Sequence, residues 1–453
     1  MKLRNLKEVE EFLFDQIPSF EKRKFPGQVG LDRTKYLMKL LGDPQEKIKI
    51  IHIAGTSGKG STAHYLSQLL GCHGFKVGLS LSPHLVDIRE RAQVGGKLLS
   101  EKKFVGYMNT LLTAFNKMKK YEYGTPTYFE LVQALAFLAF YKERVDYAVI
   151  ETGMGGTYDA TNVVKNNSKM ALITKLGLDH TKILGKTIKE IASQKAGIIQ
   201  RGNTVLSVNQ TKAAERVIDK VVLDKKAKLT FVRKGKNFRN IEVSAGETRF
   251  DFKYPGANLS HISFSGTGAH QAQNLSLALC AFYQLSKRDG FRIIENKLVK
   301  CLKNLSFPGR FDLRKVKDKK VIIDGAHNPQ KMRAFLTALK NAHGDGKYVF
   351  LLAFKKGKDY KKMLNQIIPH ASKIFITTFL AKSDMKENIS EDPESIAKCL
   401  KDKGFRKVEI EAEPHKALKK AVLAKSKNPA IVTGSLYLAG EIYKALEKDK
   451  LKR

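Results

Sequence analysis

The residues with the clearest chemical potential lie in one short glycine-rich stretch. They are Gly55, Thr56, Ser57, Gly58, Lys59, Gly60, Ser61 and Thr62. Glycines let the backbone turn tightly and approach an anion without a Cβ in the way. Successive backbone N–H groups, and the N-terminus of a helix that follows, would then point at a bound phosphate. The composition therefore predicts a loop that binds a phosphorylated ligand.

The polar residues of this loop suit a nucleoside triphosphate with its magnesium ion. Lys59 can reach the β- and γ-phosphates, and the hydroxyl of Ser61 or Thr62 can ligate Mg²⁺. The commonest spacing, GxxxxGK[ST], is not met, because only two residues separate Gly55 from Gly58 and another glycine follows Lys59. An apolar strand pattern before the loop and a helical pattern after it favour ATP binding over an ordinary glycine-rich turn.

Three further polar residues follow apolar, strand-like segments. Ser82 lies in LSPH, Glu151 ends YAVIE, and His180 lies in GLDH. Parallel sheets place their sites at the carboxyl ends of strands, so we expect these side chains beside the phosphate loop. There they would ligate Mg²⁺, which needs oxygen or hard nitrogen ligands, although histidine is an unusual choice. Each residue alone is more typical of a hydrogen-bonded strand end.

The elements that would position this chemistry alternate between strands and helices. Strand patterns in KIKIIHIAG, FKVGLSLSPH, VDYAVIETGMGG and MALITKLGLDH are separated by helical patterns such as STAHYLSQLLGCHG and YFELVQALAFLAFYKE. This order predicts an α/β fold, a parallel sheet with helices on both faces. Residues up to about 50 are expected to be helical. Between about 203 and 265, KLTFVRKG, NIEVSAG and TRFDFKYPG predict a small antiparallel β section.

The length of the chain, 453 residues, exceeds what one hydrophobic core usually serves. The chain turns at Pro308-Gly309. Five strand patterns then follow, in KKVIIDGAHNP, KYVFLLAF, KIFITTF, KVEIEA and PAIVTGS, with helical patterns between them. We therefore expect a P-loop-type ATP-binding domain over residues 1–306 and a smaller, Rossmann-like α/β domain over residues 307–453.

The charge balance is strongly basic, with 82 basic and 44 acidic residues and a formal net charge of +38. Such a balance indicates either an anionic partner, such as nucleic acid or a polyanionic substrate, or a lysine-rich solvated surface. The lysines are spread along the whole chain without a compact basic block, which favours the solvated surface.

The expected compartment is the cytoplasm. Four cysteines lie far apart without a CxxC pair, which argues against a zinc knuckle or redox motif and fits a reducing environment. The N-terminus carries acidic residues early and lacks the apolar core of a signal peptide. The longest apolar stretch, LVQALAFLAF, is too short to span a bilayer.

Nine segments, nearly end to end, resemble the folylpolyglutamate synthase and dihydrofolate synthase family of the Mur ligase superfamily. They are GTSGKGST, SPHLVDIRER, PTYFELVQALAF, ETGMGGTYDATNVV, LGLDHTKILGKTIKEIASQKAGII, HQAQN, FPGRFD, DGAHNP and GSLYLAGE. SPHL, YFE, DATN and KAGII point to the folate branch. The resemblance implies an enzyme that uses ATP and Mg²⁺ to add L-glutamate to a folate or dihydropteroate carboxylate through an acyl phosphate.

The resemblance also implies roles for residues that spacing alone would not select. Lys195, in QKAG, matches a lysine that the family carbamylates, which would make it a catalytic residue and a ligand of a second Mg²⁺; as a bare pattern it is a lysine on a helix. The implied nucleotide contacts outside the loop are Asn274, Arg310 and Asp324. Asp324 and His327 would act in catalysis from the second domain. The implied lining of the pteroate pocket is Thr127, Tyr128, Phe129 and Asp159.

Two positions depart from the family pattern. Thr157 stands where an arginine usually follows the paired glycines, and Gln194 stands where a glutamate commonly precedes the carbamylated lysine. The first departure bears on substrate binding, and the second weakens the case for Lys195.

Other functions remain open at this point. The chain is also compatible with a Mur-type ligase for a cell-wall precursor, with an NTPase that binds nucleic acid, or with an inactive binding module. YFE and DATN argue against the first, and no nucleic-acid-binding motif supports the second. Intact Lys59, Glu151 and His180 argue against the third. The expected partners are small molecules (folate or dihydropteroate, L-glutamate and ATP), without nucleic acid or membrane, and the expected state is a monomer.

Overall fold

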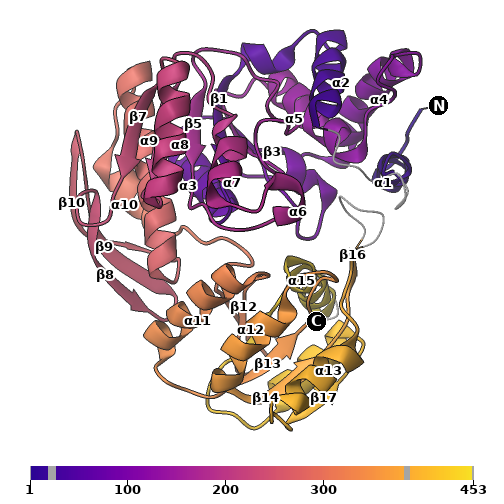
Figure 1. Ribbon diagram of the computed structural model, residues 1–453, viewed down its shortest axis with the longest axis vertical. Helices are drawn as coiled ribbons and strands as arrows, with labels where there is room; N and C mark the ends of the chain where they lie inside the picture. Colours follow the sequence, from indigo (N-terminus) through magenta and orange to yellow (C-terminus); the bar gives the residue numbers. More distant parts are fainter. Residues whose placement is uncertain (1, 19–26, 382–387, 451–453) are drawn as a thin grey trace. The chain divides into compact units, whose positions relative to one another are not determined.

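The computed structural model describes residues 2–18, 27–381 and 388–450 (Figure 1). The chain divides into two compact units. The first comprises Met1–Arg239, Asp251–Ile262 and Gln273–Leu302, and the second comprises Asn240–Phe250, Ser263–Ala272 and Lys303–Arg453. No helix in the described ranges has the length and apolar character that crossing a bilayer requires.

Within the described residues, the first unit is built on a seven-stranded sheet with the order β3-β2-β4-β1-β5-β6-β7. Its strands are β1 (Lys49–Ala54), β2 (Val77–Ser80), β3 (Gln93–Val94), β4 (Tyr147–Glu151), β5 (Met170–Ile173), β6 (Thr204–Val208) and β7 (Lys228–Val232). All neighbours pair in parallel except β2 with the short edge strand β3. The predicted parallel sheet is confirmed.

The register of the central strands brings the functional segments together. Ile53 of β1 pairs with Glu151 at the end of β4, and Ala54 pairs with Ile173 at the end of β5. The phosphate loop follows β1 directly, so the ends of β4 and β5 flank it. These three strands are buried on both faces apart from Lys49, which explains their nearly continuous apolar sequences.

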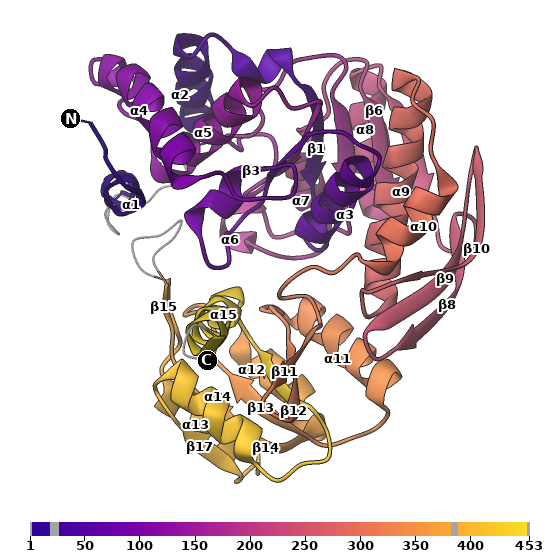
Figure 2. The ribbon, with the colours of Figure 1, turned by 180° about the vertical axis from the view of Figure 1, so that it is seen from behind.

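Helices cover both faces of this sheet. Those up to residue 303 are α1 (Leu6–Asp15), α2 (Gly27–Leu40), α3 (Lys59–Cys72), α4 (Glu101–Met118), α5 (Tyr128–Lys142), α6 (Thr181–Leu184), α7 (Ile188–Ala196), α8 (Lys212–Asp224), α9 (Ala269–Asp289) and α10 (Glu295–Lys303). Figures 1 and 2 show α7 and α3 on opposite faces. The predicted helices at α3 and α5 are confirmed, and so is helical structure before residue 50. Residues 19–26, which fall within that expectation, lie outside the described residues.

The prediction for KLTFVRKG is wrong. This segment forms β7, which pairs in parallel with β6 as the edge of the main sheet. The intervening α8 supplies the long crossover that a parallel pair requires. As an edge strand, β7 is partly exposed along most of its length, so it lacks the continuous apolar run of the central strands.

The other two segments do form the small β section. It consists of β8 (Phe238–Ser244), β9 (Glu247–Tyr254) and β10 (Ala257–Phe264), in the order β10-β9-β8. Two-residue turns join consecutive strands, and each turn has a glycine at positive φ, Gly246 and Gly256. Such turns are typical of β-hairpins. The third strand, β10, was not predicted from the sequence.

The second unit contains, in the part of the chain described, a six-stranded sheet with the order β11-β12-β18-β13-β14-β17. Its strands are β11 (Asp312–Val316), β12 (Lys319–Ile323), β13 (Tyr348–Leu352), β14 (Ala371–Ile376), β17 (Val408–Ile410) and β18 (Ala430–Thr433). Its helices are α11 (Pro329–His343), α12 (Tyr360–Ile367), α13 (Pro393–Asp402), α14 (Pro414–Leu423) and α15 (Leu436–Lys450). The five predicted strands are confirmed. The antiparallel edge strand β11 and the β15 (Leu380–Ala381) to β16 (Asn388–Ile389) pair were not predicted.

Candidate active site

The phosphate loop is packed too closely for side chains at two of its glycines. A Cβ on Gly55 would lie 1.8 Å from Thr174 Oγ1, and a Cβ on Gly58 would lie 2.2 Å from Asn274 Oδ1. Gly58 also has a φ of +91°, and α3 begins at the next residue. The loop is therefore a bare backbone turn at a helix N-terminus, the arrangement that binds phosphate groups.

Hydrogen bonds fix the loop to the segment that follows β5. The N–H groups of Thr56 and Ser57 both donate to the carbonyl of Lys175 at 3.0 Å. The Thr56 hydroxyl donates to the carbonyl of Gly177 at 3.0 Å and accepts its N–H at 3.1 Å. The buried Ser57 Oγ has no hydrogen-bond partner among the described residues. A phosphate oxygen would satisfy it, so the loop fits ATP.

Lys59, Glu151 and Ser82 lie together at the carboxyl end of the sheet. The Lys59 ammonium lies 3.8 Å from Glu151 Oε1, and the Ser82 N–H donates to Glu151 Oε2 at 3.0 Å. The Glu151 side chain is buried, whereas Ser82 is half-buried. A carboxylate with a nearby hydroxyl fits Mg²⁺, which is usually held by one or two carboxylates together with substrate phosphates and water.

His180 lies at an exposed turn just before α6. Its backbone is left-handed, with a φ of +51°, and its Nε2 lies 3.9 Å from the Asp179 carboxylate. Within the described residues, no group of three or more His, Cys, Asp or Glu side chains is arranged to hold a metal. The structure thus brings Ser82 to Glu151, and it does not cluster His180 with two other such side chains.

Lys195 is buried at the end of α7 and reaches the phosphate loop. Its Nζ donates to the carbonyl of Gly55 at 2.7 Å, across 140 residues of sequence. A buried ammonium is costly unless it is hydrogen-bonded, so this contact fixes the side chain at the loop. The structure therefore brings Lys195 to the first glycine of the phosphate loop.

The N-terminus of α5 is fixed by a buried ion pair. Glu130 receives two hydrogen bonds of 2.6 Å from the Arg33 guanidinium, a bidentate pair. Glu130 Oε2 also accepts the N–H of Thr127 at 3.1 Å. The Tyr128 ring stacks on Phe14, with ring centroids 5.9 Å apart. Two of the residues predicted for the pteroate pocket are thus fixed in place.

Phe129 and Asp159 meet the loop that follows β4. A Cβ on Gly153 would lie 2.3 Å from Phe129 Cζ, so the ring packs directly on this backbone. The buried Asp159 carboxylate accepts the N–H of Met154 at 2.8 Å. Burial, the largest cause, raises the pKa of Asp159, and Lys59 is among the groups that oppose the shift. Asp159 thus orders the loop and lies within the electrostatic reach of Lys59.

In the second unit, Asp324 is a buried carboxylate surrounded by donors. Its Oδ2 accepts the N–H of Phe311 at 2.9 Å, and its Oδ1 accepts the N–H of Ala326 at 2.8 Å. Burial raises the pKa of Asp324, and the positive charge of Arg310 opposes that shift. Arg310 also lowers the pKa of His270, after burial as the larger cause. Arg310 and Asp324 are thus neighbours in the second unit.

His327 has a partner, Lys331, that was not predicted from the sequence. Its Nδ1 lies 2.8 Å from the carbonyl of Gly325, and its Nε2 lies 2.9 Å from Lys331 Nζ. The carbonyl can only accept, so Nδ1 carries the proton and Nε2 accepts from the ammonium. Lys331 lies in the first turn of α11, whereas His327 precedes the helix, so helical spacing in the sequence gave no signal for this pair.

Arg91 was also missed, although it lies in the quoted SPHLVDIRER segment. It is fully buried, and its guanidinium donates to His84 Nδ1 at 3.1 Å and to the carbonyl of Leu81 at 3.3 Å. These contacts bracket Ser82. A fully buried arginine is rare unless its guanidinium is hydrogen-bonded or paired, but the sequence does not show that this residue is buried.

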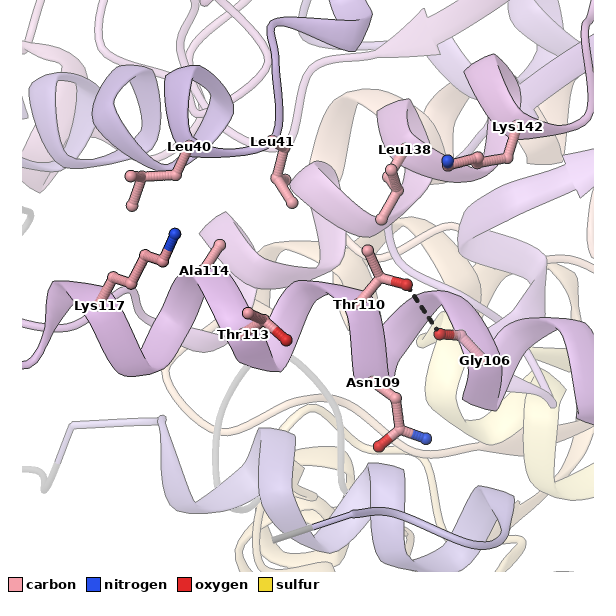
Figure 3. Close-up of a pocket in the computed structure, with 10 residues that line it drawn as sticks. All are labelled: Leu40, Leu41, Gly106, Asn109, Thr110, Thr113, Ala114, Lys117, Leu138 and Lys142. Atoms are coloured by element: carbon pink, nitrogen blue, oxygen red, sulfur yellow. Dashed lines mark hydrogen bonds between the residues drawn. The ribbon is translucent and has the colours of Figure 1, made fainter.

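A cavity of about 510 Å³ opens between α2, α4 and α5 (Figure 3). It is lined by Leu40, Leu41, Gly106, Asn109, Thr110, Thr113, Ala114, Lys117, Leu138 and Lys142. None of the predicted site residues is among them. Thr127 and Phe129 lie at the N-terminus of α5, whereas this cavity meets its C-terminal half, so the predicted site lies elsewhere.

Family models match most of the chain. The Mur ligase middle domain matches residues 92–282, and the C-terminal domain of dihydrofolate synthetase matches residues 310–445. A dihydrofolate synthase/folylpolyglutamate synthase of Bacillus subtilis is 32% identical over 437 residues, 94% of this chain and 96% of the relative. A dihydrofolate synthetase of Saccharomyces cerevisiae is 30% identical over 427 residues, 92% of this chain and 97% of the relative.

Solved structures agree with these relatives. A Mycobacterium tuberculosis folylpolyglutamate synthase complexed with ADP and AMPPCP superposes with a TM-score of 0.83 at 28% identity, covering 97% of both chains. An FPGS–AMPPCP–folate complex superposes with a TM-score of 0.79 at 26% identity, covering 98% of this chain and all of the other. With its phosphate loop and two α/β units, the chain belongs to the folylpolyglutamate synthase and dihydrofolate synthase family of ATP-dependent Mur-type ligases.

Proposed function

We propose that this enzyme uses ATP to join L-glutamate to the carboxylate of a folate or a dihydropteroate, through an acyl phosphate. The observation that carries the proposal is the segment after β4. Glu151, the last residue of β4, lies beside Lys59 of the phosphate loop. The chain then continues to Gly153, which packs against Phe129, and to the buried Asp159. One short stretch of chain therefore connects the nucleotide residues to those that we propose for the pteroate.

The proposed role of the phosphate loop is to reduce the repulsion between the acceptor carboxylate and the triphosphate of ATP. A carboxylate must approach a triphosphate, so their repulsion has to be offset before the acyl phosphate can form. Lys59 and the N–H groups at the start of α3 are fixed in advance, which makes them effective at stabilising charge that develops during the reaction. The residues proposed for nucleotide binding here are Gly55, Thr56, Ser57, Gly58, Lys59, Gly60, Ser61, Thr62 and Asn274.

Glu151 and Ser82 are the proposed metal ligands, together with His180 and, for a second ion, carbamylated Lys195. When bound, Mg²⁺ neutralises phosphate charge. The chain's own contribution is to hold the Glu151 carboxylate against the Ser82 backbone and to keep Lys195 at the carbonyl of Gly55.

We propose that residues 1–306 and 307–453 act as two domains and that Arg310, Asp324 and His327 act on the same nucleotide. Because water hydrolyses an acyl phosphate, a second domain is useful for excluding water from the reaction. Asp324 is held by two backbone N–H groups and His327 by Gly325 and Lys331, which makes both suitable as fixed contacts.

A direct assay tests the function. The purified protein is incubated with ATP and L-glutamate and, in separate reactions, with dihydropteroate, tetrahydrofolate or a cell-wall nucleotide precursor, and the products are weighed. We expect a dihydropteroate or folate product heavier by one or more glutamyl residues, with ADP formed in proportion. Glutamate-dependent ADP formation with the cell-wall precursor alone would refute the proposal.

We further propose that the enzyme acts in the cytoplasm as a monomer, without nucleic acid. The dispersed lysines support the absence of nucleic acid, since they form no compact basic block and a positive field also raises encounter rates with anionic small substrates. Light scattering of the purified chain tests the oligomeric state. ATP turnover that DNA or RNA stimulates with a steep salt dependence would contradict the absence of nucleic acid.

A further inference from the structure

A chain of buried hydrogen bonds connects β1 to the loop that follows β4. His52, on β1, is completely buried, and its Nε2 lies 2.7 Å from Thr161 Oγ1. The same hydroxyl lies 2.5 Å from Oδ1 of Asp159. His52 and Thr161 are 109 residues apart in sequence, so the fold has built this contact.

The direction of these hydrogen bonds follows from the surroundings of Asp159. Its Oδ1 also accepts the N–H of Thr161 at 3.0 Å, and its Oδ2 accepts the N–H of Met154. The carboxylate thus accepts at both oxygens, and the hydroxyl hydrogen of Thr161 points to it. A hydroxyl has one hydrogen, so its oxygen accepts from Nε2–H of His52.

The state of His52 is consistent with this direction. Its Nδ1 is buried and has no hydrogen-bond partner among the described residues, as expected for the unprotonated nitrogen of a neutral ring. Burial, the larger cause, and the charge of Lys169 hold the pKa of His52 well below its ordinary value. His52 therefore acts as a neutral donor with one tautomer.

The loop held by this chain is the one on which Phe129 packs. Asp159 fixes the N–H of Met154, and the preceding residue, Gly153, leaves no room for a Cβ against the Phe129 ring. A shift of the Asp159 carboxylate would move Met154 and with it the backbone under Phe129. One end of the chain of bonds therefore lies at residues proposed for the acceptor, and the other lies at His52 within β1.

We propose that His52 and Thr161 are positioning residues for the acceptor: their hydrogen bonds hold Asp159 and the Gly153–Met154 backbone in the conformation that binds the folate-type substrate. This inference rests on the function proposed above, because it takes Phe129 and Asp159 as acceptor contacts. It adds two residues, neither of which touches substrate, and it assigns them to binding of the acceptor rather than of ATP.

Paired variants of Thr161 test the inference. Thr161→Val keeps the shape and removes the hydroxyl, whereas Thr161→Ser keeps the hydroxyl. A hydrogen bond to a charged group contributes about 1.5–3 kcal/mol, so we expect T161V to raise the KM for the acceptor about 10- to 100-fold. The KM for ATP should stay within about twofold, and T161S should remain close to the unmodified enzyme on both measures, since its bonds are retained.

Paired variants of His52 provide a second test, which decides the question if T161V does not fold. Glutamine places its amide NH₂ near the position of Nε2, whereas asparagine places it near Nδ1. H52Q should therefore keep the acceptor KM close to that of the unmodified enzyme, and H52N should raise it as T161V does. Thermal unfolding of each variant is measured alongside the kinetics.

The outcomes separate this inference from the proposed function. If the unmodified enzyme glutamylates no folate or dihydropteroate, the proposed function fails. If it does, and T161V shows an unchanged acceptor KM or an equal rise in both KM values, only the positioning role fails. Equal behaviour of H52Q and H52N would overturn it as well.

Discussion

The hydroxyl of Thr157 donates to the backbone carbonyl of Gln194 at 3.1 Å, and the Thr157 N–H donates to the same carbonyl at 2.8 Å. The two positions at which this chain departs from the family pattern are therefore in direct contact. They join the loop after β4 to the last turn of α7, next to Lys195. A short side chain fits here because Thr157 also packs against the backbone of Gly197.

Gly197→Ala should damage both stability and turnover. Its Cβ would lie 2.0 Å from Thr157 Oγ1 and 2.7 Å from Thr157 Cα, so the loop or α7 would have to move. Overpacking of this kind costs about 1–3 kcal/mol, and the movement would reach Lys195. Urea unfolding and kcat measure the two effects. Gly71→Ala on α3 is the matched control, since nothing lies within 4 Å of its Cβ, and an unaffected G197A would contradict the packing argument.

Lys59→Ala should abolish useful turnover while the fold survives. Loss of one preorganised contact to developing charge typically lowers kcat by about 10²–10³. The side chain lies at Glu151 and its loss leaves that carboxylate without its cation, so ATP binding should weaken too. Single-turnover kinetics and nucleotide titration check this, with exposed Lys212→Ala as the control. Near-normal activity of K59A would refute the assignment of the loop.

Glu130→Ala should be among the more destabilising substitutions in the first unit. It leaves the buried Arg33 guanidinium unpaired and frees the N–H of Thr127. Breaking a buried pair from one side costs about 3–5 kcal/mol, whereas replacing both partners by apolar residues costs much less. The double variant R33M/E130L is thus expected to recover most of the loss in urea unfolding. A double variant as unstable as E130A would show that the pair itself stabilises the fold.

Asp324→Ala and His327→Ala should reduce ligation more than nucleotide binding. Both residues are proposed to act during transfer, while the phosphate loop supplies the main contacts to ATP. Calorimetric titration with a nonhydrolysable nucleotide and a turnover assay give the two quantities. Lys331→Met removes the partner of His327 Nε2 and should change kcat in the same direction by a smaller factor. Equal losses of binding and turnover would contradict this division of roles.

His270 should make folding sensitive to mild acid. Burial, the largest cause, and the charge of Arg310 lower its pKa from 6.5 to about 4, so the folded state holds the ring neutral. Below pH 6.5 the unfolded chain binds a proton that the folded chain does not, so the free energy of unfolding falls by about 3 kcal/mol between pH 6.5 and 4. The difference in stability between the unmodified protein and H270Q should shrink by that amount. A difference that does not change with pH would contradict the neutral state of the half-buried His270 ring.

Local patterns account for much of the architecture. The strand before the phosphate loop, the helix after it and five strands of the second unit's six-stranded sheet could be predicted, because apolar periodicity and glycine stops are properties of neighbouring residues. Prediction failed for β7. An alternating sequence fits an antiparallel strand and also an edge strand of a parallel sheet, and β7 pairs in parallel with β6, from which α8 separates it in the sequence.

The sequence by itself determined which functional groups this protein carries: a glycine-rich loop with Lys59, and the carboxylate of Glu151 at the end of a strand. Tertiary structure alone decided which distant groups meet, including Lys195 at Gly55, Arg33 at Glu130 and His52 at Thr161. These contacts span 97 to 140 residues. Such pairs arise because strand order and helix packing bring segments together, and burial then requires each polar group to find a partner, a requirement that no local pattern records.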